Sequence, residues 1–165
     1  MKKTPLRLIT ASAMFAALIF AATYFIKIPI PNGYVHAGDG LVFLAAAFLP
    51  LPYAMAASAI GMGLCDLVLG YALWIPATVL TRVLATLIFS RKGKICTVRN
   101  MIAALASVLI IAAGYWAYEA ILYGVLAALA NVPLNLAQSA LGAAIFIAVG
   151  KFADKMGATK KTERH

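Results

Sequence analysis

Charged and amide side chains interrupt stretches of this sequence that are otherwise almost wholly apolar. Three ionisable residues lie in or beside such stretches, and three amides repeat at i, i+4 and i+7 in the last one: Asp66, Arg82, Glu119, Asn131, Asn135 and Gln138. Charged groups are costly in lipid, so they normally face the interior of a helix bundle and mark a pathway or a binding site. Each of these residues lies near the end of its segment that faces away from the basic loops. We therefore expect a small-molecule pocket that opens outward.

The composition fixes the class of protein. The chain has 165 residues, of which 64% are hydrophobic and 12% are charged. Such a chain has too little polar surface for a soluble globule, so we expect an integral membrane protein. The length leaves no room for a soluble catalytic or nucleotide-binding module, and residues 1–165 are expected to form a single transmembrane domain.

Six apolar segments can be counted against the roughly 20 residues that a helix needs to cross the hydrocarbon. They cover residues 8–26, 39–51, 52–69, 75–89, 100–123 and 133–152. The second and third are separated only by Pro50, Leu51 and Pro52, which predict a turn between two helices. The expected fold class is therefore an all-α membrane protein with six transmembrane helices in one bundle.

The distribution of charge gives the orientation. Twelve of the 14 Lys and Arg residues fall in the N-terminal stretch, in the loop between the fourth and fifth segments, or at the C-terminal end. The positive-inside rule then places both termini in the cytoplasm, with residues 1–7 as a short N-terminal stretch and residues 154–165 as a basic tail. This orientation and anionic lipid headgroups account for the net charge of +9 without a nucleic acid.

The outer loop at residues 27–38 is the densest run of turn-forming residues in the chain. Two prolines stiffen its start, and Gly33 and Gly38 permit tight turns, so we expect an ordered connection that can cover a site. Asp39 follows directly and is placed to cap the second helix. The alternative is that His36 and Asp39 contact a ligand when the loop closes. A metal site is weakly indicated, because no third or fourth ligand accompanies this pair.

Two helix pairs bring further polar groups together. A hairpin of the third and fourth helices brings Asp66 and Arg82 to similar depth, which predicts a buried ion pair. Tyr115 precedes Glu119 by one helical turn, and both share a face with access to the amide residues. Each group has two interpretations, since ion pairing and hydrogen bonding between helices would also explain them.

Aromatic residues gather at the same outer level. Most of them are typical of the belt at a membrane interface, but one or two could stack on a planar ligand. The set comprises Tyr34, Tyr71, Trp74, Trp116, Tyr118 and Tyr123.

Small residues form one face of the first helix. Ala13, Ala17 and Ala21 recur every four residues, and small residues at this spacing allow another helix to approach closely. This face either packs inside the bundle or docks a partner membrane protein.

The outer charges indicate the class of ligand. The net charge at the outer side is about −1, from the acidic Asp39, Asp66 and Glu119 and the basic Arg82 and Lys27. This charge disfavours a strongly anionic substrate. A neutral or amine-bearing heterocycle fits this field better.

The strings GYVHAGDGLVFLAAAFLP and IGMGLCDLVLGYALWIPAT, followed by Arg82, resemble the substrate-binding S components of energy-coupling factor (ECF) transporters. The similarity covers roughly residues 11–150. It implies six helices that hold a vitamin-like molecule at the outer side of a prokaryotic cytoplasmic membrane, with the first loop as a gate. It also implies partners, namely a transmembrane coupling subunit and two ATPases. By this resemblance Ala13, Ala17 and Ala21 form the docking face, and the pocket candidates are Tyr34, His36, Asp39, Asp66, Trp74 and Arg82.

The resemblance implies capture of a heterocycle such as a pyrimidine or pyridine vitamin precursor or a queuosine-type base, for uptake driven by ATP. We expect no enzyme activity, cofactor, metal or nucleic-acid partner. Two other classes stay open at this point. A small ion-coupled carrier would also use buried carboxylates, although no inverted repeat is evident. An intramembrane hydrolase would need a nucleophile beside His36, and neither serine nor cysteine adjoins it.

Overall fold

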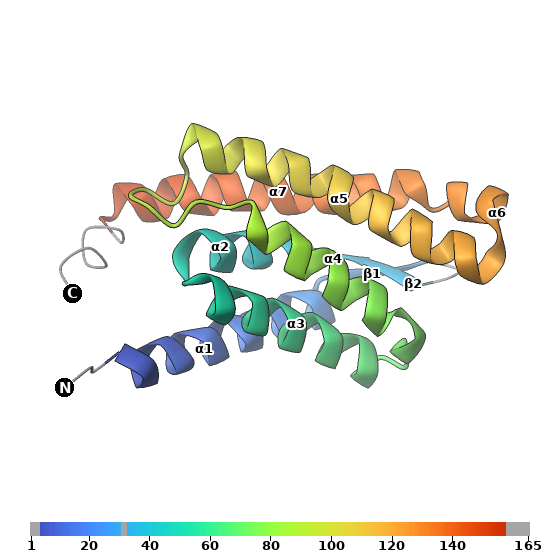
Figure 1. The fold of residues 1–165 in the computed structure, drawn as a ribbon, viewed down its shortest axis with the longest axis horizontal. Coiled ribbons are helices and arrows are strands. Elements are labelled where there is room, and N and C mark those ends of the chain that lie inside the picture. Colours follow the sequence, from blue (N-terminus) through green and yellow to red (C-terminus); the bar gives the residue numbers. More distant parts are fainter. Residues whose placement is uncertain (1–3, 31–32, 158–165) are drawn as a thin grey trace.

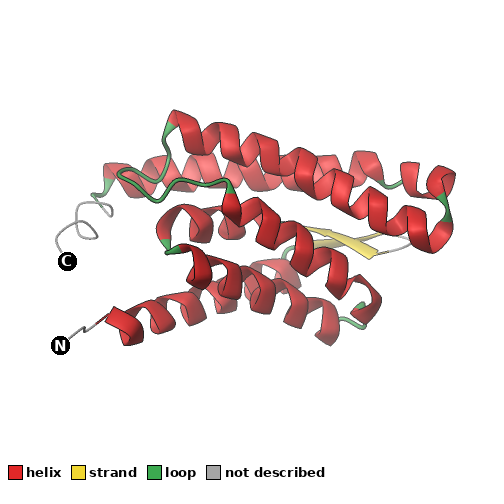
Figure 2. Cartoon of the chain, viewed as in Figure 1, coloured by secondary structure: helices red, strands yellow, loops and turns green. Residues whose placement is uncertain are grey.

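The computed structural model describes residues 4–30 and 33–157, and helices dominate it (Figure 2). The long helices are α1 (Thr4–Phe25), α3 (Leu51–Val68), α5 (Val98–Tyr123) and α7 (Val132–Lys155). The shorter elements are β1 (Lys27–Ile30), β2 (Gly33–His36), α2 (Asp39–Phe48), the 3-10 turn η1 (Ala72–Trp74), α4 (Ile75–Leu87) and α6 (Val125–Leu129).

The six predicted segments correspond to α1, α2, α3, α4, α5 and α7, so the fold class is confirmed. Among the described residues, four helices are long and apolar enough to cross a membrane, the last of them formed by α6 and α7 together. Helices α2 and α4 are apolar but shorter, with 10 and 13 residues. The tail predicted at 154–165 begins inside α7, which continues to Lys155, and residues 158–165 lie outside the described part.

The chain runs back and forth along the long axis of the molecule (Figure 1). Helix α1 packs on α3, α3 on α4, α4 on α5, and α5 on α7. The start of α1, the loop between α4 and α5, and the end of α7 lie at one end. The two strands and α6 lie toward the other end. The basic segments are therefore together, as the charge pattern predicted.

Prolines and one threonine set the helix starts. Pro52, Pro76 and Pro133 each occupy a first-turn position, where their missing N–H has no intrahelical partner to lose. The hydroxyl of Thr97 accepts a hydrogen bond from the Asn100 N–H and caps α5. The predicted turn at Pro50–Pro52 is confirmed, since α2 ends at Phe48 and α3 begins at Leu51.

Helix α2 lies at the centre of the bundle. It packs against α1, α3, α4 and α7, and eight of its ten residues are buried. Close approach to α7 depends on Gly142, because a Cβ added there would stand 2.6 Å from Cβ of Asp39. Helix α2 is therefore the central element around which the other helices pack.

The outer loop forms a hairpin, which the sequence reasoning did not predict. Strands β1 and β2 are antiparallel, with Lys27 opposite His36 and Ile30 opposite Gly33. The Ala37 N–H donates to the carbonyl of Ile26, which closes the base of the hairpin. Strand β2 also contacts α7 and α1, so the hairpin holds its side chains close to these helices.

Candidate functional site

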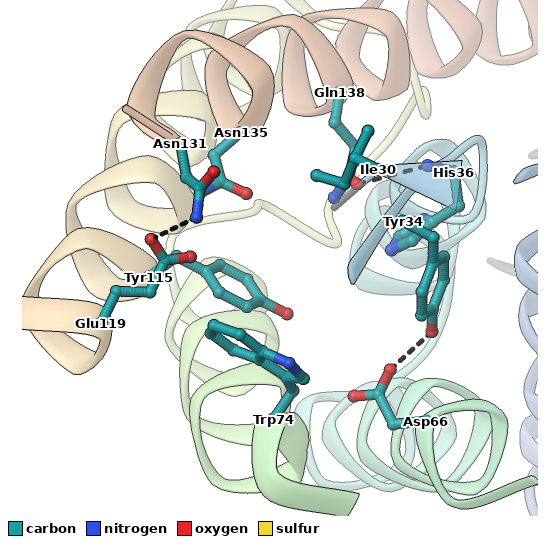
Figure 3. Close-up of a pocket in the computed structure, with 10 residues that line it drawn as sticks. All are labelled: Ile30, Tyr34, His36, Asp66, Trp74, Tyr115, Glu119, Asn131, Asn135 and Gln138. Carbon is teal, nitrogen blue, oxygen red and sulfur yellow. Dashed lines mark hydrogen bonds between the residues drawn. The ribbon is translucent and has the colours of Figure 1, made fainter. Parts of the chain in front are cut away.

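A pocket lies between the hairpin and the outer ends of α3, α5 and α7 (Figure 3). The side chains around it come from six elements and the residue that precedes α7, and most of them are polar or aromatic. Ten residues line it: Ile30, Tyr34, His36, Asp66, Trp74, Tyr115, Glu119, Asn131, Asn135 and Gln138.

The structure brings together nine of the eleven residues that the sequence singled out. Asp39 and Arg82 are the exceptions, because both are fully buried and neither lines the pocket. Ile30 lines the pocket and was missed, since an isoleucine in a loop carries no chemical signal. The polar residues converge because each lies near the outer end of its helix or on β2.

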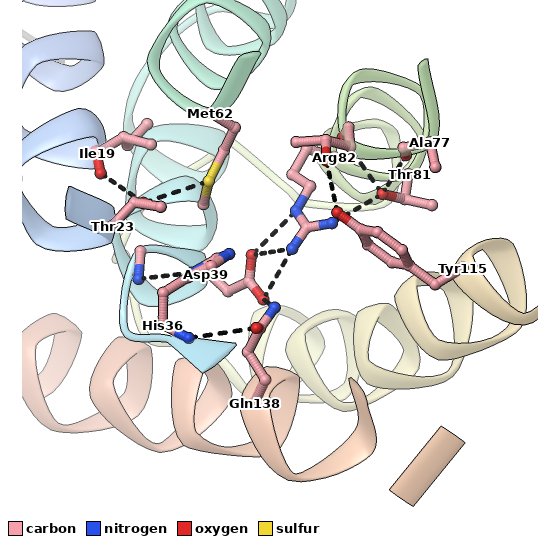
Figure 4. A network of polar contacts seen from close by, with 12 residues as sticks. Ile19, Thr23, His36, Asp39, Met62, Ala77, Thr81, Arg82, Tyr115 and Gln138 are labelled. Atoms are coloured by element: carbon pink, nitrogen blue, oxygen red, sulfur yellow. Dashed lines mark hydrogen bonds and ion pairs between the residues drawn. The ribbon is translucent and has the colours of Figure 1, made fainter. Parts of the chain in front are cut away.

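The predicted ion pair between Asp66 and Arg82 is wrong. Arg82 pairs instead with Asp39, with 3.0 Å between Nη2 and Oδ1 (Figure 4). Nε of Arg82 also donates to Oδ1 at 3.1 Å, and its Nη1 donates to the hydroxyl of Thr81. The physical reason is that α2 lies between the other helices, so the Asp39 carboxylate at its start is nearer to the guanidinium than the carboxylate of Asp66 on α3.

Asp39 does not act as a simple helix cap. The position before it, Gly38, provides no side-chain cap, and the Asp39 carboxylate faces Arg82 and Gln138. Its role in this structure is to neutralise the buried guanidinium.

Gln138 connects this ion pair to the hairpin. Its Nε2 donates to Oδ2 of Asp39 at 3.1 Å, and its Oε1 accepts the backbone N–H of His36 at 3.2 Å. The amide orientation is fixed by these two bonds, because a carboxylate can only accept and an N–H can only donate. Gln138 therefore ties β2 to the floor of the pocket.

His36 is a neutral imidazole at this site. Burial lowers its pKa to about 4, while Asp39 opposes that shift and Arg82 adds to it. Its Nδ1 accepts the Gly38 N–H at 3.2 Å, so the proton of the neutral ring is on Nε2. The ring thus offers a hydrogen-bond donor at the pocket wall.

Tyr34 and Asp66 join the hairpin to α3. The Tyr34 hydroxyl donates to Oδ1 of Asp66 at 2.5 Å, and burial together with this carboxylate raises the Tyr34 pKa. Oδ2 of Asp66 is buried and has no hydrogen-bond partner among the described residues. This oxygen is an acceptor available to a ligand.

Aromatic rings form another wall. Trp74 contacts Tyr115, Tyr118 and Tyr123, with ring centroids 6.0 to 6.2 Å apart. Tyr118 donates its hydroxyl proton to the carbonyl of Leu73, which fixes that end of the cluster. Trp74 and Tyr115 reach the pocket, whereas Tyr118 and Tyr123 do not line it.

Glu119 and the amides of α7 complete the pocket. Nδ2 of Asn131 donates to Oε2 of Glu119 at 2.9 Å. Asn135 lies beside them on the wall (Figure 3). Asn131 immediately precedes α7 and Asn135 lies one turn into it, so the predicted stripe does face the cavity.

The open space in this pocket is small. Its volume is about 40 Å³, whereas ligand pockets typically measure roughly 300 Å³ or more. A molecule with a ring would need more space than this, so the hairpin or the side chains would have to move apart to admit one. Tyr34 and Gln138 make the hydrogen bonds that connect the hairpin to α3 and α7.

The predicted docking face lies on the surface of α1, and the groove there shares no lining residue with the pocket. Ala13 and Ala17 line an apolar groove between α1 and α3, together with Pro52, Ala56 and Gly61. Ala21 is half-buried and is not part of the groove. No group of three or more His, Cys, Asp or Glu residues suited to a metal occurs among residues 4–30 and 33–157.

The chain matches the family described as ECF-type riboflavin transporter, S component, over residues 3–155. The search of curated proteins found no match. Members of the matched family are substrate-binding subunits that work with a transmembrane subunit and ATPases, and they are not enzymes. A match over nearly the whole chain, together with the multi-pass helical fold, shows that this protein belongs to the family of ECF transporter S components.

Proposed function

We propose that the pocket beneath the hairpin binds a small, neutral or amine-bearing heterocycle of the vitamin class, for uptake powered by partner ATPases. The observation that carries this proposal is the convergence of aromatic walls and polar groups on one space at the outer end of the bundle. Planar rings stack on Trp74 and Tyr115, and the surrounding amides and carboxylates select among heterocycle edges.

The charge of the site supports this class of ligand. Asp66 and Glu119 line the pocket, whereas Arg82 lies behind it and is paired with Asp39. A phosphorylated or carboxylated substrate would therefore meet repulsion. The family description names riboflavin, which is itself a heterocyclic vitamin, so riboflavin is the first compound to test.

The hairpin serves as the gate in this proposal. Two hydrogen bonds hold it over the cavity. The Tyr34 hydroxyl donates to Asp66, and the His36 N–H donates to the side chain of Gln138. Both bonds break when the hairpin lifts. A bound ligand that offers a donor or an acceptor to the same groups then stabilises the closed hairpin.

The groove between α1 and α3 is the proposed contact with the transmembrane coupling subunit. Ala13 and Ala17 are exposed within it, and Ile9 and Ile60 flank them. A helix from the partner can approach closely over alanines, which is how helices associate in lipid. We place the complex in the cytoplasmic membrane of a prokaryote, with the basic segments inside.

Native mass spectrometry of the protein purified in detergent tests the proposed function. We expect a co-purified heterocycle bound one to one, and Asp66→Asn is expected to weaken its binding at least tenfold, about 1.4 kcal/mol. Asp154→Asn, which changes a carboxylate at the other end of the bundle, should leave the affinity unchanged. Unchanged affinity in Asp66→Asn would return this residue to a purely structural role.

A further inference from the structure

Buried acidic groups outnumber buried basic groups in the bundle. The buried ionisable groups of the described chain include three carboxylates, from Asp39, Asp66 and Glu119, and one guanidinium, from Arg82. Arg82 and Asp39 are both fully buried and pair with each other. Asp66 and Glu119, which are only 4% and 3% exposed, have no cation within ion-pair distance among the described residues.

Asp66 is also incompletely hydrogen-bonded. Tyr34 donates to Oδ1, but Oδ2 has no hydrogen bond within 3.5 Å in the part of the chain that the structure describes. The Thr78 side chain interacts with this carboxylate, but its hydroxyl is 2.6 Å from the Tyr115 hydroxyl and is shared with it. Leaving a buried charged acceptor without a donor is costly, so a donor from outside the chain is expected there. Figure 3 shows this oxygen on the side of Asp66 that faces the cavity and Trp74.

Glu119 supplies a second negative group across the pocket. Its contact with Asn131 satisfies a hydrogen bond but brings no charge. The indole of Trp74 lies on the wall between the two carboxylates, and the face of an indole attracts cations. The guanidinium of Arg82 is placed over Tyr115, 5.0 Å from its centroid, so the aromatic wall already holds one cation on its far side.

We propose that the ligand is a cation, a planar ring that bears a protonated nitrogen, and that its N–H group binds Oδ2 of Asp66. This inference rests on the proposed function, because it concerns the ligand of the same pocket. It narrows the class from neutral or amine-bearing heterocycles to those that are positively charged at neutral pH, such as amidinium-like or protonated amino heterocycles. An amidinium matches a carboxylate especially well, since its parallel N–H groups reach the oxygens in a charge-assisted contact.

Three probes that share one ring and differ in charge provide the test. Benzamidinium, benzamide and benzoate are titrated separately into the full-length protein in detergent, and binding is followed by quenching of tryptophan fluorescence, since Trp74 lines the pocket. We expect benzamidinium to bind at least tenfold more tightly than benzamide, and benzoate to bind most weakly.

Two variants connect the preference to the carboxylate. In Asp66→Asn the ratio between benzamidinium and benzamide should fall below about threefold, because the amide keeps an oxygen but loses the charge. In Asp154→Asn, whose carboxylate lies at the inner end, the ratio should stay as in the unmodified protein. The ranking of the three probes on the unmodified protein decides the matter by itself if Asp66→Asn does not fold.

The outcomes separate this inference from the proposed function. Equal or tighter binding of benzamide, tight binding of uncharged riboflavin, or a preference that survives in Asp66→Asn would overturn the cationic ligand and leave a heterocycle pocket in place. A failure of all three probes to bind at about 10 mM, together with a failure of riboflavin to bind up to its solubility limit, would count against both.

Discussion

Replacing Arg82 with methionine gives the sharpest test of how the pocket is supported. The substitution keeps an unbranched chain of similar reach in α4 and removes the guanidinium, so the Asp39 carboxylate is left buried with no counter-charge. Both side chains are fully buried, and 3.0 Å separates Nη2 of Arg82 from Oδ1 of Asp39. At that distance the Coulomb attraction is on the order of 5 kcal/mol for an effective dielectric constant of about 20.

Breaking such a pair by removing one partner typically costs about 3–5 kcal/mol, since the remaining charge is uncompensated. For a chain of this length a loss of that size lowers the unfolding temperature by roughly 10 °C. We expect this shift for Arg82→Met in detergent, measured by circular dichroism at the helix band. The double variant Arg82→Met with Asp39→Asn removes both charges and should recover most of the loss.

Two results would refute this reasoning. One is an unfolding temperature of Arg82→Met within about 2 °C of the unmodified protein, which would mean that Asp39 needs no partner. The other is a double variant less stable than Arg82→Met alone, because the penalty would then not come from the unpaired carboxylate.

Three further predictions concern other parts of the molecule. Because the His36 pKa is about 4 in the folded protein against 6.5 when unfolded, the unfolded state binds more protons between these values. Stability should therefore fall by up to about 3 kcal/mol as the pH decreases from about 6.5 to 4, and less in His36→Asn; identical pH profiles in melting experiments would contradict this. Ala17→Leu should abolish co-purification with the coupling subunit but leave ligand binding intact, whereas an intact complex would assign this face to internal packing. Gly142→Ala should destabilise the bundle by about 1–3 kcal/mol, because its Cβ would stand 2.6 Å from Cβ of Asp39. The control Gly63→Ala, whose Cβ would have its nearest neighbour 3.4 Å away, should not lower the stability. Equal melting curves for the two variants would count against tight packing of α2 on α7.

Much of the fold was predictable because lipid restricts what a chain can do. Apolar length, prolines at helix starts and the position of basic residues act locally, so they can be read without knowledge of neighbours. The same restriction explains why the candidate polar residues surround one cavity. Polar groups near the outer helix ends must turn inward, so those that lie at the same level meet in one place.

The pairing of Arg82 could not be read from local pattern. The sequence places Asp66 and Arg82 on consecutive helices, but it does not state which helix occupies the centre. The signal that was available is the composition of residues 39–48, which are apolar or small on every face apart from Asp39. A helix that is apolar all round is buried, and its single carboxylate is then the nearest partner for a buried cation.

The hairpin was missed for a different reason. Prolines at positions 29 and 31 argue against a strand, and the strands are only four residues long. The dipeptide Asn32–Gly33 indicates a turn, but Gly33 is already part of β2 and pairs with Ile30, so the register differs from the one that this dipeptide predicts. A strand at the edge of a sheet tolerates a proline whose missing N–H faces away from its partner, so Pro29 is compatible with β1.

The shortness of α2 determines how deep in the bundle the pocket lies. Ten residues of helix span about 15 Å, half of the roughly 30 Å of hydrocarbon. One end of α2 lies beside the loop between α4 and α5, where Arg91 donates to the carbonyl of Leu49. A helix of this length that starts at one boundary of the hydrocarbon ends near its middle, so the hairpin takes the place that a second half of α2 would fill. In the orientation and function that we propose, a molecule bound beneath the hairpin would already have covered part of the distance across the membrane before the subunit moves.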